Sequence, residues 1–70
     1  MDRIQVSSSS LASVGFDQNT KILEIEFLSG AVYQYYAVPE KIYRNLMNAA
    51  SHGKYFAANI RNDYMVRLRR

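Results

Sequence analysis

Hydrophobic and polar residues alternate most clearly in the segment K-I-L-E-I-E-F. Leu23, Ile25 and Phe27 fall on one face of an extended chain, whereas Glu24 and Glu26 fall on the other. This alternation predicts an antiparallel strand with one face in the core. The two glutamates are expected on the solvated face of the resulting sheet.

Three further segments are predicted to be extended. The tyrosine-rich segment A-V-Y-Q-Y-Y follows L-S-G, and its aromatic and β-branched side chains favour a partner strand. Gly30 fits a loop position with positive φ between these two strands. Two shorter candidates precede them, I-Q-V and S-V-G-F, and the turn-prone D-Q-N-T follows the second.

The length of the loop between the two clearest strands decides which face carries the tyrosines, because directly opposed residues share a face. If L-S-G is a three-residue loop, Tyr33 opposes Ile25 and Tyr35 opposes Leu23 on the apolar face. A two-residue loop would instead place both tyrosines beside glutamates and bury Gln34 at a cost in free energy. We therefore predict the three-residue loop, with both tyrosines mainly in the core and their hydroxyls bonded to polar partners at its edge.

Helical spacing replaces alternation after Pro39, which suits the first turn of a helix. Over residues 41–50 the apolar positions share one arc: Ile42, Tyr43, Leu46, Met47, Ala49 and Ala50. A second short helix is predicted over residues 54–60, with Ser51 as a candidate cap and Gly53 closing the first helix. The last segment, Y-M-V-R-L-R-R, alternates again and is either an edge strand or a loose tail.

These elements predict an α+β fold, an antiparallel sheet of three to four strands with two helices packed on one face. Seventy residues form a single domain, residues 1–70, in which residues 1–5 and Arg69 and Arg70 are expected to fray. The chain has no cysteine, which excludes disulfides and cysteine zinc sites and suits a reducing cytoplasm. It also has no signal-peptide pattern and no apolar run near the roughly 20 residues of a membrane span. A cytoplasmic domain without a membrane partner is expected.

Residues typical of an active site are missing from the sequence. His52 is the only histidine and lies in the expected turn between the helices, where an exposed position is predicted. Glu24 and Glu26 share a face and form a candidate carboxylate pair, although such pairs are more often the solvated side of a sheet. The three glycines form no phosphate-binding motif, and the serines at positions 7–10 have no neighbouring base. We expect no enzymatic activity, cofactor or metal site.

Charge is distributed unevenly around a net value of +3, since residues 1–35 sum to −2 and residues 36–70 sum to +5. This asymmetry favours a polyanion or an acidic protein as partner, with a solubilising surface as the alternative. Basic residues interleaved with aromatic ones are typical of RNA binding, because arginines meet phosphates and tyrosines stack on bases. The candidate nucleic-acid-binding residues are Lys54, Tyr55, Arg61, Tyr64, Arg67 and Arg69, with Tyr36 as a further stacking candidate.

A series of short motifs resembles the KTSC domain family over residues 6–68. The motifs are S-S-S-L, V-G-F-D, L-E-I-E-F-L-S-G, V-Y-Q-Y, V-P-E-K-I-Y, A-A-S-H-G-K-Y-F and N-I-R. The family is named for the C-terminus of some lysyl-tRNA synthetases and also occurs as small free-standing bacterial proteins. Its central Y-x-Y motif matches Tyr33 and Tyr35, whereas Met65 stands where many members have proline. The resemblance implies a small domain of uncertain function, with RNA, and tRNA in particular, as a partner by association.

The sequence therefore predicts a non-enzymatic accessory domain that binds RNA or another polyanion through its basic C-terminal half. The alternative is a protein-interaction module that pairs through a sheet edge or forms a homo-oligomer, with no role in nucleic-acid binding. The ligand, the pathway and the oligomeric state stay open at this point.

Overall fold

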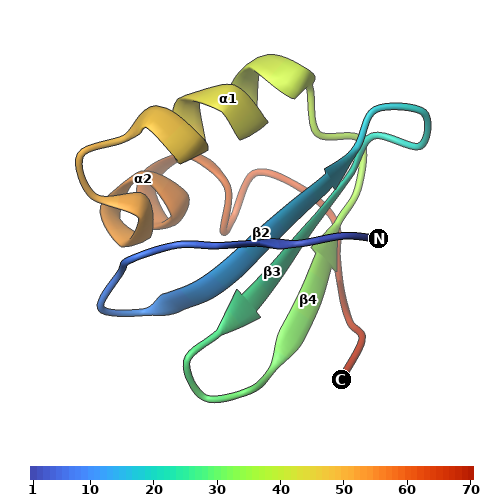
Figure 1. Ribbon diagram of the computed structural model, residues 1–70. Helices are drawn as coiled ribbons and strands as arrows, with labels where there is room; N and C mark the ends of the chain where they lie inside the picture. The colour runs from blue at the N-terminus through green and yellow to red at the C-terminus, as the bar shows by residue number, and fades with distance from the viewer.

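The computed structural model describes the whole chain, residues 1–70, as five strands and two helices. The elements are β1 (Ile4–Gln5), β2 (Leu11–Asp17), β3 (Ile22–Phe27), β4 (Val32–Tyr35), α1 (Glu40–Asn48), α2 (His52–Asn59) and β5 (Val66–Leu68). The strands form one antiparallel sheet in the order β1-β2-β3-β4-β5, and both helices lie on the same face of it (Figure 1). The α+β class is confirmed, and the sheet has five strands because the first and last candidate segments both pair.

The β3–β4 hairpin has the predicted three-residue loop. Leu23 pairs with Tyr35 and Ile25 pairs with Tyr33, so both tyrosines share the apolar face of the sheet. Gly30 ends the loop with φ at +96°, a conformation that glycine adopts without steric cost. Tyr35 is buried and Tyr33 is half-buried against the core, which confirms the predicted side for both rings.

The core lies between the sheet and the two helices. Its buried members are Leu11, Val14, Leu23, Ile25, Tyr35, Val38, Leu46, Phe56 and Ile60. Leu46 is the buried residue of α1, and Phe56 is the buried residue of α2. A domain of this size buries only about 60% of its unfolded surface. Loss of any one of these core side chains should therefore lower its stability substantially.

The turn between the helices differs from the prediction at Gly53. This glycine lies in the first turn of α2 and does not close α1. A Cβ atom on it would lie 2.5 Å from the hydroxyl oxygen of Ser10, so the Ser10 side chain packs directly against Gly53 and would have to move to admit a larger residue. Ser51 caps α2 as predicted, because its side chain accepts a hydrogen bond from the backbone N–H of Lys54 at 3.2 Å.

His52 is also placed differently from the prediction of an exposed loop residue. It is the first residue of α2 and is half-buried. Its Nδ1 lies 2.8 Å from the carbonyl oxygen of Leu46 in α1. Because a carbonyl oxygen only accepts, this contact puts a proton on Nδ1. The ring thus satisfies a carbonyl group near the end of α1 and joins the two helices.

The sheet face opposite the helices is covered by the N-terminal segment, which corrects the expectation that both glutamates are solvated. The Nε of Arg3 donates to the hydroxyl of Ser13 at 2.9 Å, and its guanidinium also donates to the carboxylate of Glu24. Gly15 permits this arrangement, because a Cβ atom there would lie 2.7 Å from the carbonyl oxygen of Asp2. As a result, Glu24 is only 3% exposed.

Two further groups hold the Glu24 carboxylate from the other side. Gln34 in β4 donates to it at 2.9 Å, and the Nε of Arg69 lies 3.8 Å from it. Burial by itself would raise the pKa of Glu24. Hydrogen bonds from Gln34 and Arg3, together with the charges of Arg3 and Arg69, outweigh burial and lower this pKa from its ordinary value of 4.5. An ionised carboxylate therefore links four segments of the chain.

Both ends of the chain, which the sequence suggests would fray, form hydrogen bonds in the structure. Ile4–Gln5 pair with β2 as strand β1. Val32 receives a backbone hydrogen bond from Arg69 at 2.7 Å and donates one to Arg70 at 3.1 Å. The C-terminal segment is thus an edge strand and not a loose tail. Neither helix has the length and apolar character needed to cross a membrane.

The packing of α1 predicts unequal effects from two neighbouring substitutions. Leu46 is 0% exposed, so Leu46→Ala should lower the free energy of unfolding by about 2–5 kcal/mol. Asn45 is exposed, and Asn45→Ala should change it by less than about 0.5 kcal/mol. Denaturant titration of both variants measures the difference. Equal losses in the two variants would contradict the assignment of the buried face.

The Glu24 network predicts a specific loss of stability in acid. Because the folded pKa is lowered below 4.5, the carboxylate stabilises the fold above that pH, and this contribution disappears as the pH falls through the lower folded pKa. Glu24→Gln should therefore reduce stability at neutral pH and flatten its decline between about pH 5 and pH 3. The free energy of unfolding, measured by denaturant titration across this range, tests the prediction.

Glu40→Gln is the control for this experiment. Glu40 has a side chain that is 38% exposed and lies 4.0 Å from Arg44, an ion pair of the surface type that contributes at most about 1 kcal/mol. This variant should keep the wild-type acid profile. If Glu24→Gln keeps it as well, the buried carboxylate is not the source of the acid sensitivity.

Candidate functional site

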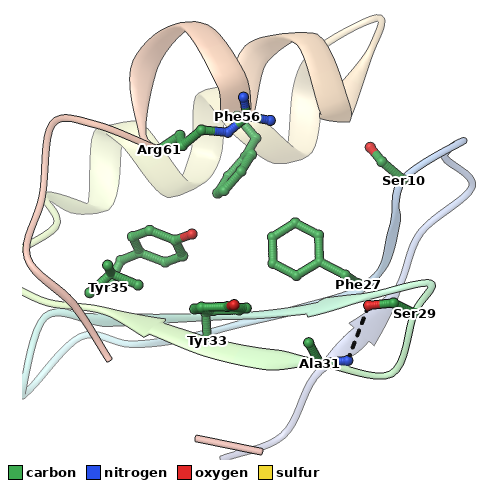
Figure 2. Close-up of a pocket in the computed structure, with 9 residues that line it drawn as sticks. Ser10, Phe27, Ser29, Ala31, Tyr33, Tyr35, Phe56 and Arg61 are labelled. Atoms are coloured by element: carbon green, nitrogen blue, oxygen red, sulfur yellow. Dashed lines mark hydrogen bonds between the residues drawn. The ribbon is translucent and has the colours of Figure 1, made fainter. Parts of the chain in front are cut away.

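A pocket with a volume of about 570 Å³ opens between α2 and the β3–β4 hairpin. Its lining residues are Ser10, Phe27, Ser29, Ala31, Tyr33, Tyr35, Phe56, Arg61 and Val66. Figure 2 shows Phe56 projecting from α2 toward the sheet, with the aromatic side chains of Phe27, Tyr33 and Tyr35 facing it from the strands. The volume lies within the range of about 300–1,000 Å³ that is typical of small-molecule sites.

Edge-to-face contacts hold the aromatic walls in place. The ring centroid of Phe27 lies 5.6 Å from that of Tyr33 and 5.4 Å from that of Phe56. Tyr35 and Phe56 are 5.5 Å apart in the same kind of contact. Each such pair contributes about 0.5–1.5 kcal/mol beyond the burial of its area. In Figure 2 the ring of Tyr33 lies flat along the sheet, with one face toward the pocket.

Two polar groups give the pocket its chemical character. Arg61 follows α2, and its guanidinium carbon lies 5.7 Å from the centre of the Phe56 ring, within the range of a cation–π contact. The hydroxyl of Tyr35 points into the pocket and is not enclosed by the core (Figure 2). The sequence instead predicts that this hydroxyl bonds to a polar partner at the edge of the core.

Burial raises the pKa of Tyr35, and neighbouring Tyr33 adds to this effect while the charge of Arg61 opposes it. The Tyr35 phenol therefore stays neutral at physiological pH. In that form its hydroxyl can both donate and accept a hydrogen bond within a largely apolar pocket.

The tyrosines that the sequence predicts to bind nucleic acid are half-buried in the structure. Tyr55 in α2 and Tyr64 before β5 are half-buried and pack against the core. Tyr36 lies beyond the end of β4, and its hydroxyl donates to Gln34 at 3.3 Å in the Glu24 network. None of these three rings lines the aromatic pocket. The aromatic rings that line the pocket therefore belong to other residues, Phe27, Tyr33, Tyr35 and Phe56.

The predicted basic residues lie on different faces. Arg67 pairs with Gln34 across β4 and β5, so Arg67 and Arg69 belong to the sheet face opposite the helices. Arg61 lies on the helix side, at the pocket. Lys54 is exposed on α2. The basic residues of the C-terminal half are therefore divided between two faces of the molecule, which meet along β5.

β5 forms one open edge of the sheet, because it pairs with β4 alone. Val66 and Leu68 point to the helix side, opposite Tyr35 and Tyr33, yet they are 47% and 60% exposed. The two helices do not cover this end of the sheet, which is also why the pocket is open. The structure has no cluster of three or more side chains of the metal-binding types.

Comparison with known proteins gives one consistent family. The model of the KTSC domain matches residues 7–64. An uncharacterized protein of Stutzerimonas stutzeri (strain A1501) is 48% identical over 56 residues, which cover 80% of this chain and 79% of that protein. A lysine–tRNA ligase of Nostoc punctiforme is 34% identical over 61 residues, which cover 87% of this chain but only 11% of the ligase.

Solved structures lead to the same result. The crystal structure of a KTSC domain protein from Yersinia pestis matches this fold with a TM-score of 0.96 and 38% sequence identity. The match covers 99% of this chain and 97% of the Yersinia chain. Sequence and fold thus agree over nearly the whole molecule, and the chain belongs to the KTSC domain family.

Proposed function

We propose that this chain is a non-enzymatic accessory domain that binds single-stranded RNA along its β5 edge. The observation that carries this proposal is a group of free arginines at that edge. Arg61, Arg67 and Arg70 are exposed and form no salt bridge within the molecule. Unpaired guanidinium groups are suited to phosphates, which they bind through charge and paired hydrogen bonds.

The position of β5 lets one extended ligand reach both sets of arginines. Arg67 and Arg69 lie on one face of the sheet, whereas Arg61 lines the pocket on the other face together with Val66 of β5. A strand of RNA that crosses the β5 edge would contact both faces. Glu24, the buried carboxylate of this region, has its charge offset by Arg3, which reduces its repulsion of phosphate.

The relatives support the same choice of ligand. A lysine–tRNA ligase contains a region similar to this chain, so a domain of this kind occurs within an enzyme named for its action on tRNA. This is an association and gives no contact with RNA. Together with the free arginines it favours RNA over other polyanions.

A protein-interaction module is the second candidate, and the open edge of β5 supports it. Met65, Val66 and Leu68 expose apolar side chains beside a free strand edge. However, β5 is only three residues long and is followed by arginines, and short, charged edge strands oppose pairing with other strands. We therefore place this function second.

Salt dependence separates the two candidates. RNA held by about four phosphate contacts should show a log–log slope near −3, or roughly fifty-fold weaker binding at 200 mM than at 50 mM salt. A mainly apolar protein interface should change little over the same range. Retention of RNA and of protein from a native lysate, with and without nuclease, identifies which ligand class is present.

Replacement of Arg61, Arg67 and Arg69 by glutamine should abolish RNA retention and leave the melting temperature within a few degrees of the wild type. The three side chains are exposed, and the one ion-pair contact among them, from Arg69 to Glu24 at 3.8 Å, is made by a side chain that is 63% exposed. Their loss should therefore remove phosphate contacts and little packing. Filter binding and thermal denaturation measure the two quantities.

The matched control replaces Lys21, Lys41 and Arg44 by glutamine. These side chains are also exposed, and their replacement removes the same charge from other parts of the surface. This control should lose much less affinity than the β5-edge variant. Unchanged RNA binding by the first triple variant, or no binding by the wild type, would overturn the proposal.

A further inference from the structure

We infer that the aromatic pocket holds one unpaired base of the RNA bound at the β5 edge. This inference rests on the proposed function, because it needs RNA at that edge. It adds a second mode of contact, in which arginines bind the backbone while the pocket takes a base. Arg61 takes part in both modes, whereas the aromatic walls belong to the pocket alone, so substitution of an aromatic residue tests the pocket separately.

The walls of the pocket suit a flat ring. Tyr33 turns one face of its ring toward the cavity, and Phe27 and Phe56 close two other sides (Figure 2). Their mutual edge-to-face contacts fix these rings before any ligand enters. A planar base gains from such preformed aromatic faces, and stacking of this kind tolerates any base identity.

The polar groups of the pocket favour a base over an aliphatic side chain. The hydroxyl of Tyr35 faces the cavity, and an aliphatic group there would remove water from it without replacing the hydrogen bond. A base has donors and acceptors along its edges that would restore this bond. Ser10 adds a second hydroxyl to the lining.

The charge at the pocket complements a nucleotide. Arg61 lines the cavity, lies over the Phe56 ring and has no carboxylate partner, so its guanidinium is free for the phosphate next to an inserted base. Val66 belongs both to the pocket lining and to β5. The RNA backbone would therefore leave the pocket across the strand whose other face carries Arg67.

The test compares an oligouridylate of about ten nucleotides with the same oligomer made abasic, using fluorescence anisotropy on the full-length domain. The wild type should bind the intact oligomer more tightly. Tyr33→Leu keeps an apolar side chain but removes the flat ring, and should weaken binding of the intact oligomer roughly tenfold. It should leave binding of the abasic oligomer unchanged.

Tyr43→Leu is the matched control, because Tyr43 is also half-buried and stacks on another ring, Phe16, at 5.0 Å, away from the pocket. It should leave both affinities unchanged. Equal wild-type affinity for intact and abasic oligomers would overturn the pocket inference and leave RNA binding at the edge intact. No affinity for either oligomer would overturn both proposals.

A measurement on the unmodified protein covers the case in which Tyr33→Leu fails to fold. The ring-proton NMR signals of Phe27, Tyr33 and Phe56 should shift when the intact oligomer is added and stay in place with the abasic one. Identical responses to the two oligomers would show that no base enters the pocket.

Discussion

The register of the β3–β4 hairpin is the constraint on which the rest of the molecule depends. A loop of three residues sets Tyr33 and Tyr35 opposite Ile25 and Leu23, and a shift by one residue would move every side chain of β4 to the other face. The same register places Gln34 against Glu24. One loop length thus determines the aromatic pocket on the helix side and the polar network on the opposite side.

The polar network explains how a very short N-terminal strand stays in place. β1 has two residues and both are exposed, so burial of apolar area contributes little there. Arg3 instead joins the sheet through Ser13 and Glu24, and Gly15 provides the space for this close approach. Removal of Arg3 would leave the buried Glu24 carboxylate with only Gln34 and Arg69 as partners, which should lower stability. The N-terminal segment is therefore held by strand pairing with β2 and by the polar contacts of Arg3.

Local patterns account for the part of the structure that the sequence predicts. Alternation in β3 and the three-residue loop follow from neighbouring residues, and they correctly give the side of Tyr33 and Tyr35. The burial of Glu24 cannot be obtained in this way, because its partner Arg3 is 21 positions away and no local pattern links the two. The contact of His52 with the carbonyl oxygen of Leu46 likewise depends on the packing of one helix against the other. The pocket arises because two helices leave the β5 end of the sheet uncovered, a consequence of the number of paired strands.

In a domain of seventy residues, the same aromatic side chain can belong both to the core and to the wall of a pocket. Phe56 contacts both Phe27 and Tyr35 and is 2% exposed, so it belongs to the core even though it lines the pocket. Tyr33 makes one aromatic contact and is half-buried, and Arg61 is exposed. A substitution at the exposed Arg61 should therefore change the chemistry of the pocket at a small cost in stability, whereas a substitution at Phe56 should destabilise the pocket together with the core.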